Sequence, residues 1–295
     1  MTIIVDDPRK NAIEALRASV STSVWTSNKQ FVSDLKAEIK QHALASNPII
    51  DVFNQGLLSL EAVKTIHLEY RHAIVQIFTD ALLMAQFQTR QLEPRLSPGS
   101  KMPARFLLTL NVLDEFGFQP GYDQSNYYKG NPAYAHYPLF EKVLDDLGVS
   151  DRERLHHIPS QIAADVRNFL ELSFPNYNSV VALLAVAEEQ VILYSPPLRE
   201  SVKAIGGHVA DGYYHVHGVT TDHGTEAADD DHEDDLWYAL MQAATSDQYD
   251  QIRYICLAYC DLWDKFWTFQ YNVHCRHLFP TPLSALAENA SRIIY

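Results

Sequence analysis

The chain has 295 residues, of which 47% are hydrophobic and 20% charged, and its formal net charge is −14. This composition allows a full hydrophobic core and excludes an intrinsically disordered protein. The excess of acidic residues disfavours nucleic acid and anionic membranes as partners, and it suits a soluble enzyme that acts on a small molecule.

The cysteine content and the N-terminus indicate the compartment. The three cysteines, Cys256, Cys260 and Cys275, are a low and odd number. The first residues, MTIIVDDPRKNAIEAL, are too charged for a secretory signal, and the longest aliphatic run, near residues 180–187, is too short to cross a bilayer. We therefore expect a cytoplasmic protein in a reducing environment.

The N-terminal half is predicted to be helical. Residues 1–26 have weak periodicity, so we expect a loosely attached arm, followed by a single helical domain over residues 27–295. A first helix is predicted after Ser27, ending before Pro48, and a second over residues 59–88, where apolar residues recur at helical spacing. A third is predicted to end at Gly117.

Residues 117–135 form a long connection rich in Gly, Pro, Asn and Tyr. Connections of this length inside a compact domain are usually functional or mobile. Two hypotheses remain open for it: a lid that orders over a substrate, or a surface excursion packed by its own aromatic side chains.

The C-terminal half is also predicted to be helical. Helices are expected at residues 137–147, 151–173, 178–194, 197–217, 229–245 and 247–278. Pro196 and Pro197 are predicted to separate two of them, and residues 217–229 to form an irregular turn. No segment alternates at period two, so we expect no sheet and an all-α fold.

Six residues carry the ligand types of a metal site. Asp229 and His232 are three residues apart and would project from one helix face. A carboxylate in the apolar context of Glu188 is costly unless it is paired or bound to metal. Iron that reacts with oxygen favours mixed imidazole and carboxylate ligands, and helical bundles build two-metal sites from inward-facing Glu and His. The full candidate set is Glu115, His136, Glu188, His217, Asp229 and His232.

In these segments the chain resembles the heme-oxygenase-like diiron oxidases and oxygenases, over about residues 47–245. The matching motifs are NVLDEFG, AHYPLFEKVLDDLG, AVAEEQ, YYHVH and DDDH, which contain the six candidate residues in order. The resemblance implies a heme-oxygenase-like seven-helix bundle, and it implies that these six residues hold two Fe(II) ions that activate O2.

The chain departs from the family pattern in three places. The intervals from Glu115 to His136 and from His217 to Asp229 are longer than in the family, and the second leaves Asp222 as a rival to Asp229. Many family members add a carboxylate ligand from the helix predicted here over residues 59–88. The aligned position is Gln76, a poor ligand, and Glu69 or Asp80 are alternatives.

The acidic run and the cysteines each allow a second interpretation. The acidic run at 229–235 also suits a solvated helix start. A zinc site is an alternative for a second group, Cys256, Cys260, His274, Cys275 and His277, although Cys256 and Cys260 lie in an aromatic-rich stretch that suits core packing.

The resemblance implies an O2-dependent oxidoreductase that acts on a small amino-acid-like metabolite, by N-oxygenation, desaturation or C–C cleavage, in natural-product biosynthesis. Electrons would come from an external reductant, because the sequence has no flavin or nicotinamide fingerprint. The alternatives are a fatty-acid-type decarboxylase or desaturase and a metal-free accessory protein of the same fold. We expect no nucleic-acid or membrane partner, and the sequence is compatible with a homodimer.

Overall fold

The computed structural model describes residues 7–217 and 228–278, with side chains except at 228–233 and 277. The helices are α1 (Pro8–Ala18), α2 (Thr22–Lys40), α3 (Ile49–Asn54), α4 (Leu60–Tyr70), α5 (Phe78–Gln88), α6 (Lys101–Glu115), α7 (His136–Asp146), α8 (Asp151–His156), α9 (Gln161–Ser173), α10 (Tyr177–Ala204), α11 (Tyr213–Val216), α12 (Ala228–Ala243) and α13 (Tyr249–His274). The strands are β1 (Phe118–Tyr122) and β2 (Tyr128–Gly130).

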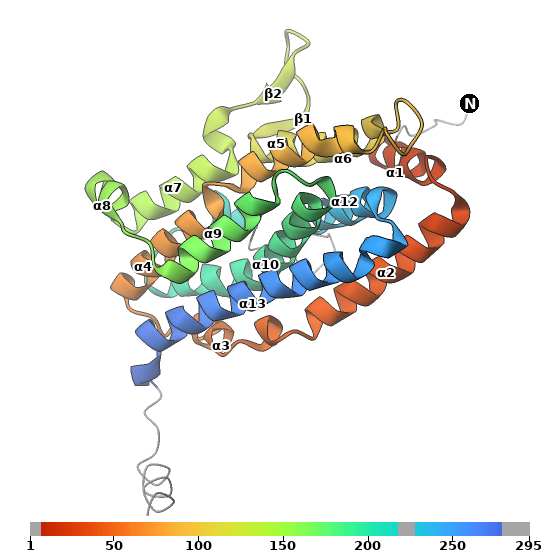
Figure 1. Cartoon of the computed structure of the whole chain (residues 1–295). Coiled ribbons are helices and arrows are strands. Elements are labelled where there is room, and N and C mark those ends of the chain that lie inside the picture. The colour runs from red at the N-terminus through yellow and green to blue at the C-terminus, as the bar shows by residue number, and fades with distance from the viewer. Residues whose placement is uncertain (1–6, 218–227, 279–295) are drawn as a thin grey trace, which may run out of the picture.

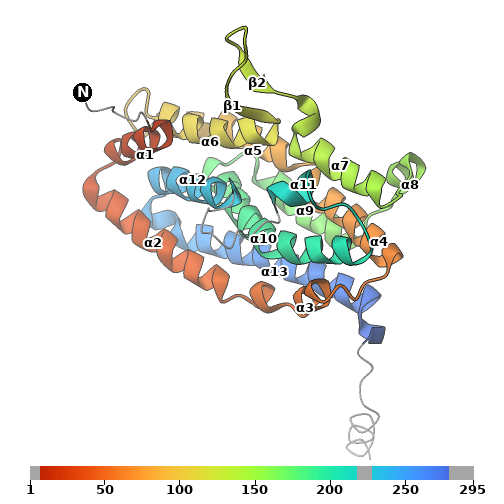
Figure 2. The ribbon, with the colours of Figure 1, turned by 180° about the vertical axis from the view of Figure 1, so that it is seen from behind.

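The central element of the bundle is α10. It packs against α3, α5, α9, α12 and α13, which surround it in both views of Figures 1 and 2. It is long and apolar enough to cross a membrane, but 72% of its most apolar stretch is buried inside the protein. This burial is that of a core helix.

Pro196 and Pro197 lie inside α10, so the predicted break between two helices is wrong. Because proline has no N–H, the carbonyls of Ile192 and Leu193 lose their α-helical donors, and an interior proline costs about 3 kcal/mol. Side chains beyond the prolines, such as Leu198, are buried in the core. Each such burial contributes roughly 1.5–3 kcal/mol, which is enough to hold the helix continuous.

The predicted helix over residues 59–88 is present, but it contains a π-helical turn at Arg71–Val75 between α4 and α5. The N–H of Gln76 donates to the carbonyl of Arg71 over 3.1 Å, five residues back. Such turns are frequent at functional sites because they insert one extra residue and rotate the side chains that follow.

The N-terminal segment differs from the expected loose arm. Residues 8–18 form α1, which packs against α6 and α12, and Leu16 is fully buried. The N-terminus of α1 is capped by the side chain of Asp7, and Pro8 occupies the first position. The short helix escaped prediction because only Ala12 and Leu16 supply its buried face.

Residues 117–135 contain an antiparallel hairpin of β1 and β2, so the expectation of no sheet is wrong. All strand positions are exposed, and therefore they show no alternation of apolar and polar residues. The hairpin is instead stabilised by contacts within its turn. The Asp123 carboxylate accepts from the N–H groups of Ser125 and Tyr127, and Asn126 has a φ of 59°. Similarly, Pro159 divides the predicted helix at 151–173 into α8 and α9.

We predict that Pro196→Ala raises the free energy of unfolding by about 1–2 kcal/mol, because alanine returns the missing N–H to the carbonyl of Ile192. Denaturant unfolding followed by circular dichroism measures this. Pro159→Ala, in the connection between α8 and α9, is the control and should not stabilise. A less stable Pro196→Ala protein would contradict the prediction.

Candidate metal centre

Three of the six candidate ligands converge. Glu115, His136 and His217 are all buried, and each offers one potential ligand atom within 4.8 Å of the others. The Nδ1 atom of His136 lies 2.8 Å from Oε1 of Glu115 and 3.0 Å from Nε2 of His217. Among the described residues, this is the one group of three or more His, Cys, Asp or Glu residues that meets the geometry of a metal site.

Glu188 lies at the same place. It comes from the middle of α10, is 2% exposed, and lines one small cavity together with Glu115, His136 and His217. The cavity has a volume of about 30 Å³, which has room for metal ions or water but not for an organic substrate. The remaining wall is mostly aromatic and aliphatic: Tyr70, Ile74, Val75, Phe78, Tyr137, Val191 and Tyr213.

The other two candidate ligands lie outside the residues whose side chains are described. The backbone of Asp229 and His232 belongs to the first turns of α12, and α12 packs along α10, the helix that carries Glu188. Asp222 lies outside the described residues altogether. The roles of all three stay predictions.

A close approach of the backbone within the connection between α6 and α7 brings Glu115 and His136 together. Glu115 is the last residue of α6 and His136 the first of α7. Between them, Gly117 has a φ of +78°, and a Cβ there would lie 2.5 Å from backbone atoms of Asn131 and Ala135. Only glycine allows this approach, which closes the base of the hairpin and returns the chain to Glu115.

A carboxylate that was not among the predicted site residues lies near the second ring nitrogen of His136. Oδ2 of Asp114 lies 3.5 Å from Nε2 of His136, on the opposite side of the ring from Glu115 and His217. Imidazoles that bind metal through one nitrogen commonly face a carboxylate with the other, which fixes the tautomer and the ring orientation. In the sequence, the adjacent acidic residues Asp114 and Glu115 in LDEFG indicate that a second carboxylate lies near the predicted ligand Glu115.

The helix region 59–88 brings none of its proposed carboxylates to this cavity. Glu69 accepts from the N–H of Ser160 at 3.0 Å and pairs with His157 at 2.9 Å. Burial raises the pKa of Glu69, but the hydrogen bonds from His157 and Ser160 outweigh this and leave the pKa below its usual value. Asp80 is exposed.

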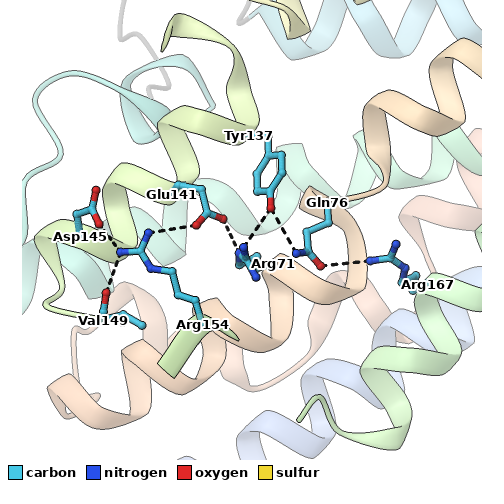
Figure 3. A network of polar contacts seen from close by, with 8 residues as sticks. All are labelled: Arg71, Gln76, Tyr137, Glu141, Asp145, Val149, Arg154 and Arg167. Carbon is cyan, nitrogen blue, oxygen red and sulfur yellow. Dashed lines mark hydrogen bonds and ion pairs between the residues drawn. The ribbon is translucent and has the colours of Figure 1, made fainter. Parts of the chain in front are cut away.

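Gln76 takes part in a polar network instead (Figure 3). Its Nε2 donates to the hydroxyl of Tyr137 over 3.3 Å, and its Oε1 accepts from Arg167 over 3.2 Å. Arg71 also donates to Tyr137, over 3.1 Å, and to Glu141. The network therefore fixes Tyr137, which lies beside His136. Tyr137 borders the small cavity that Glu115, His136, Glu188 and His217 line, which we call the metal cavity.

A buried pair of polar side chains holds the segment that carries His217. Nδ1 of His67 lies 2.7 Å from the carbonyl of Val63, which can only accept, so the proton is on Nδ1. The hydroxyl of Tyr214 then donates to Nε2 of His67 over 2.5 Å. This fixes α11 against α4, three residues before His217. Burial lowers the pKa of His67 to about 4 and keeps the ring neutral.

A larger outer cavity of about 490 Å³ adjoins the centre, and His136 borders both cavities. Its walls include Phe118, Gln119 and Tyr134 near the base of the hairpin, and the charged residues Asp114, Lys142 and Asp211. The aromatic tip of the hairpin packs on itself, with the rings of Tyr122 and Tyr128 5.4 Å apart. The tip thus matches the self-packed hypothesis, while the base forms a wall beside the site.

The alternative zinc site finds no support among the described residues, where the cysteines form no such cluster. Cys256, Cys260 and Cys275 are fully buried. Burial raises the pKa of Cys260 to about 12 and that of Cys275 to about 11. These thiols are core residues, as the aromatic stretch indicated.

Comparisons with known proteins agree on the fold. No protein-family model and no curated protein matches the sequence. A CADD-like protein of unknown function from Nostoc punctiforme is similar in structure, with a TM-score of 0.59 and 13% identity, covering 84% of this chain and 98% of that one. A TenA family transcription regulator from a Silicibacter species gives a TM-score of 0.54 at 12% identity, covering 81% and 96%. A TenA homologue from P. horikoshii gives 0.52 at 11% identity, covering 84% and 98%.

These similarities define the architecture. CADD-like and TenA-family proteins share the heme-oxygenase-like all-helical fold, and this chain has that fold, as the family resemblance implied. Identities of 11–13% carry no information about the reaction. The function has to be argued from the site itself.

We predict that Asp114→Asn weakens the binding of ferrous iron by about 10- to 100-fold, because the amide no longer orients His136 as a carboxylate does. Anaerobic metal titration measures the affinity. Asp146→Asn, exposed at the end of α7, is the control and should bind iron as the wild type does. Equal affinity in both variants would contradict the role assigned to Asp114.

A pH-dependent stability follows from His67. Its pKa is about 4 in the folded protein and 6.5 for an ordinary histidine, so between these pH values the unfolded chain binds a proton that the folded protein excludes. The free energy of unfolding should therefore fall by about 3 kcal/mol as the pH drops from about 6.5 to about 4. Denaturant unfolding at several pH values measures this loss.

The variant His67→Gln should lose stability less steeply over that range. His156→Gln is the control, because His156 is exposed on α8, and it should keep the wild-type dependence. An unchanged pH dependence in His67→Gln would show that other groups are responsible.

Proposed function

We propose that the protein is a nonheme diiron oxidase or oxygenase that uses O2 to oxidise a small amino-acid-like metabolite. The observation that carries the proposal is the convergence of Glu115, His136 and His217 with Glu188 at one buried cavity. Mixed imidazole and carboxylate donors without thiolate suit iron that reacts with oxygen. In this proposal Glu115, His136, Glu188 and His217 would hold the two ions, and Asp229 and His232 would complete the set from α12.

The donor set fits such a metal centre on chemical grounds. Two carboxylates and two imidazoles are unfavourable to bury in an apolar interior, and divalent cations would offset that penalty. The bound iron would supply oxygen activation, with electrons from an external reductant. The protein would hold the ligands, orient His136 through Asp114, and exclude bulk water with the aromatic wall of Tyr70, Phe78 and Tyr213.

The outer cavity supports an amino-acid-like substrate. Its volume of about 490 Å³ falls in the range of small-molecule sites. Lys142 can attract a carboxylate, whereas Asp114 and Asp211 can attract an ammonium group. This mixture of charges favours a zwitterionic metabolite over a fatty acid, whose chain would need an apolar cavity.

A TenA-like function through a cysteine nucleophile is disfavoured. Each cysteine is fully buried, and burial raises the pKa of the thiols, whereas a nucleophile must be accessible and ionised. None of the three lines the metal cavity or the outer cavity.

We expect anaerobically reconstituted protein to bind about two ferrous ions per chain. His217→Ala should lose at least one of them and abolish oxygen uptake with an active amino acid. His215→Ala is the matched control, because His215 is exposed on α11, two residues before His217, and should leave iron binding intact. Iron analysis and an oxygen electrode make the measurements. Wild-type protein that binds no iron would be a metal-free accessory protein, and the proposal would fail.

A further inference from the structure

A separate cavity of about 400 Å³ lies between the end of α2, the turn at residues 43–46 and α10. Its wall is mainly aliphatic, formed by Ile39, Leu44, Ala45, Val186, Ile192 and Leu193. Three polar side chains complete it: Lys40, Glu189 and Gln190. Small-molecule sites have this combination of an apolar wall and a few polar groups.

This cavity lies on the face of α10 opposite the metal cavity. Successive residues of a helix are rotated by about 100°, so Gln190 and Leu193 point away from Glu188 and Val191. Glu188 and Val191 line the metal cavity, whereas Gln190 and Leu193 line this one. A ligand here is therefore separated from the proposed irons by the helix.

The cavity wall holds one buried donor without an acceptor, from Gln190, and one exposed lysine, Lys40. Gln190 is fully buried, and its Oε1 accepts from the hydroxyl of Tyr70 over 3.2 Å. Its Nε2 has no hydrogen-bond partner, and Lys40 forms no ion pair within the part of the chain that the structure describes. A buried donor without an acceptor is costly, whereas the exposed ammonium group of Lys40 is solvated by water. An anionic group in the cavity would satisfy Gln190 and attract Lys40.

Two residues of the cavity wall have carbonyls that lack an α-helical donor. Pro196 and Pro197 cannot donate to the carbonyls of Ile192 and Leu193, and both of these residues line the cavity. Glu189 adds a carboxylate to the same wall. Acceptors of this kind suit an ammonium group.

We propose that this cavity binds an aliphatic α-amino acid as its zwitterion. The carboxylate accepts from Lys40 and from Nε2 of Gln190, and the ammonium group donates to the carbonyls of Ile192 and Leu193. The aliphatic side chain packs against the wall. Because Tyr70 lines the metal cavity and donates to Gln190, one hydrogen bond joins the proposed site to the wall of the metal cavity.

Isothermal titration calorimetry on the full-length protein tests the proposal, with and without ferrous iron and in the absence of oxygen. The probes are leucine, 4-methylpentanoate, which lacks the ammonium group, and 3-methylbutylamine, which lacks the carboxylate. Leucine should bind at least about tenfold more tightly than either analogue. No leucine binding, or equal binding of an analogue, would overturn the proposal.

Variants locate the site. Lys40→Met keeps the aliphatic stem and should weaken leucine binding about tenfold or more. The matched control is Lys36→Met, one turn earlier on α2, where the lysine pairs with Asp234 at 3.2 Å and does not line the cavity. Unchanged affinity in Lys40→Met would place leucine elsewhere. Because binding is measured without turnover, the result is independent of whether the protein is an iron enzyme.

Discussion

The burial of four ionisable side chains, Glu115, His136, Glu188 and His217, at one small cavity is the constraint on which this structure depends. Each carboxylate removed from water costs several kcal/mol unless charge and hydrogen bonds compensate. Nδ1 of His136 can form only one hydrogen bond, so it can satisfy either Glu115 at 2.8 Å or His217 at 3.0 Å but not both, and only part of that cost is offset within the protein. The surrounding helices have to hold the four groups in fixed positions, and the buried hydrogen bonds around the cavity do so.

Because α10 runs through the centre of the bundle, its two faces border two different cavities. One face presents Glu188 to the metal cavity, and the opposite face presents Gln190 to the aliphatic cavity. The prolines that interrupt its hydrogen-bond ladder are tolerated because burial outweighs their cost. They remove the α-helical donors that the carbonyls of the half-buried residues Ile192 and Leu193 would otherwise have.

Much of this could be predicted from the sequence, because helical periodicity and ligand chemistry are both local properties. The apolar surroundings of Glu188 indicated an inward carboxylate, and the order of the motifs placed Glu115, His136 and His217 in one site. The roles of Asp114 and Gln76 depend on which way a side chain points across a helix interface. The π-helical turn at Arg71–Val75 rotates Gln76 out of the register expected for a regular α-helix, and no pattern in the sequence predicts this turn.

The hairpin illustrates how the chain can depart from the family pattern without losing the site. Lengthening a loop costs little once its ends are held, since the closure entropy grows only with the logarithm of its length. Here the close approach of Gly117 to Asn131 and Ala135 holds the ends, so Glu115 and His136 remain in contact whatever lies between them. The inserted residues are then free to vary, and their base forms a wall of the outer cavity. The segment that distinguishes this chain from the family it resembles therefore lies beside the outer cavity, which is the substrate site in the proposed function.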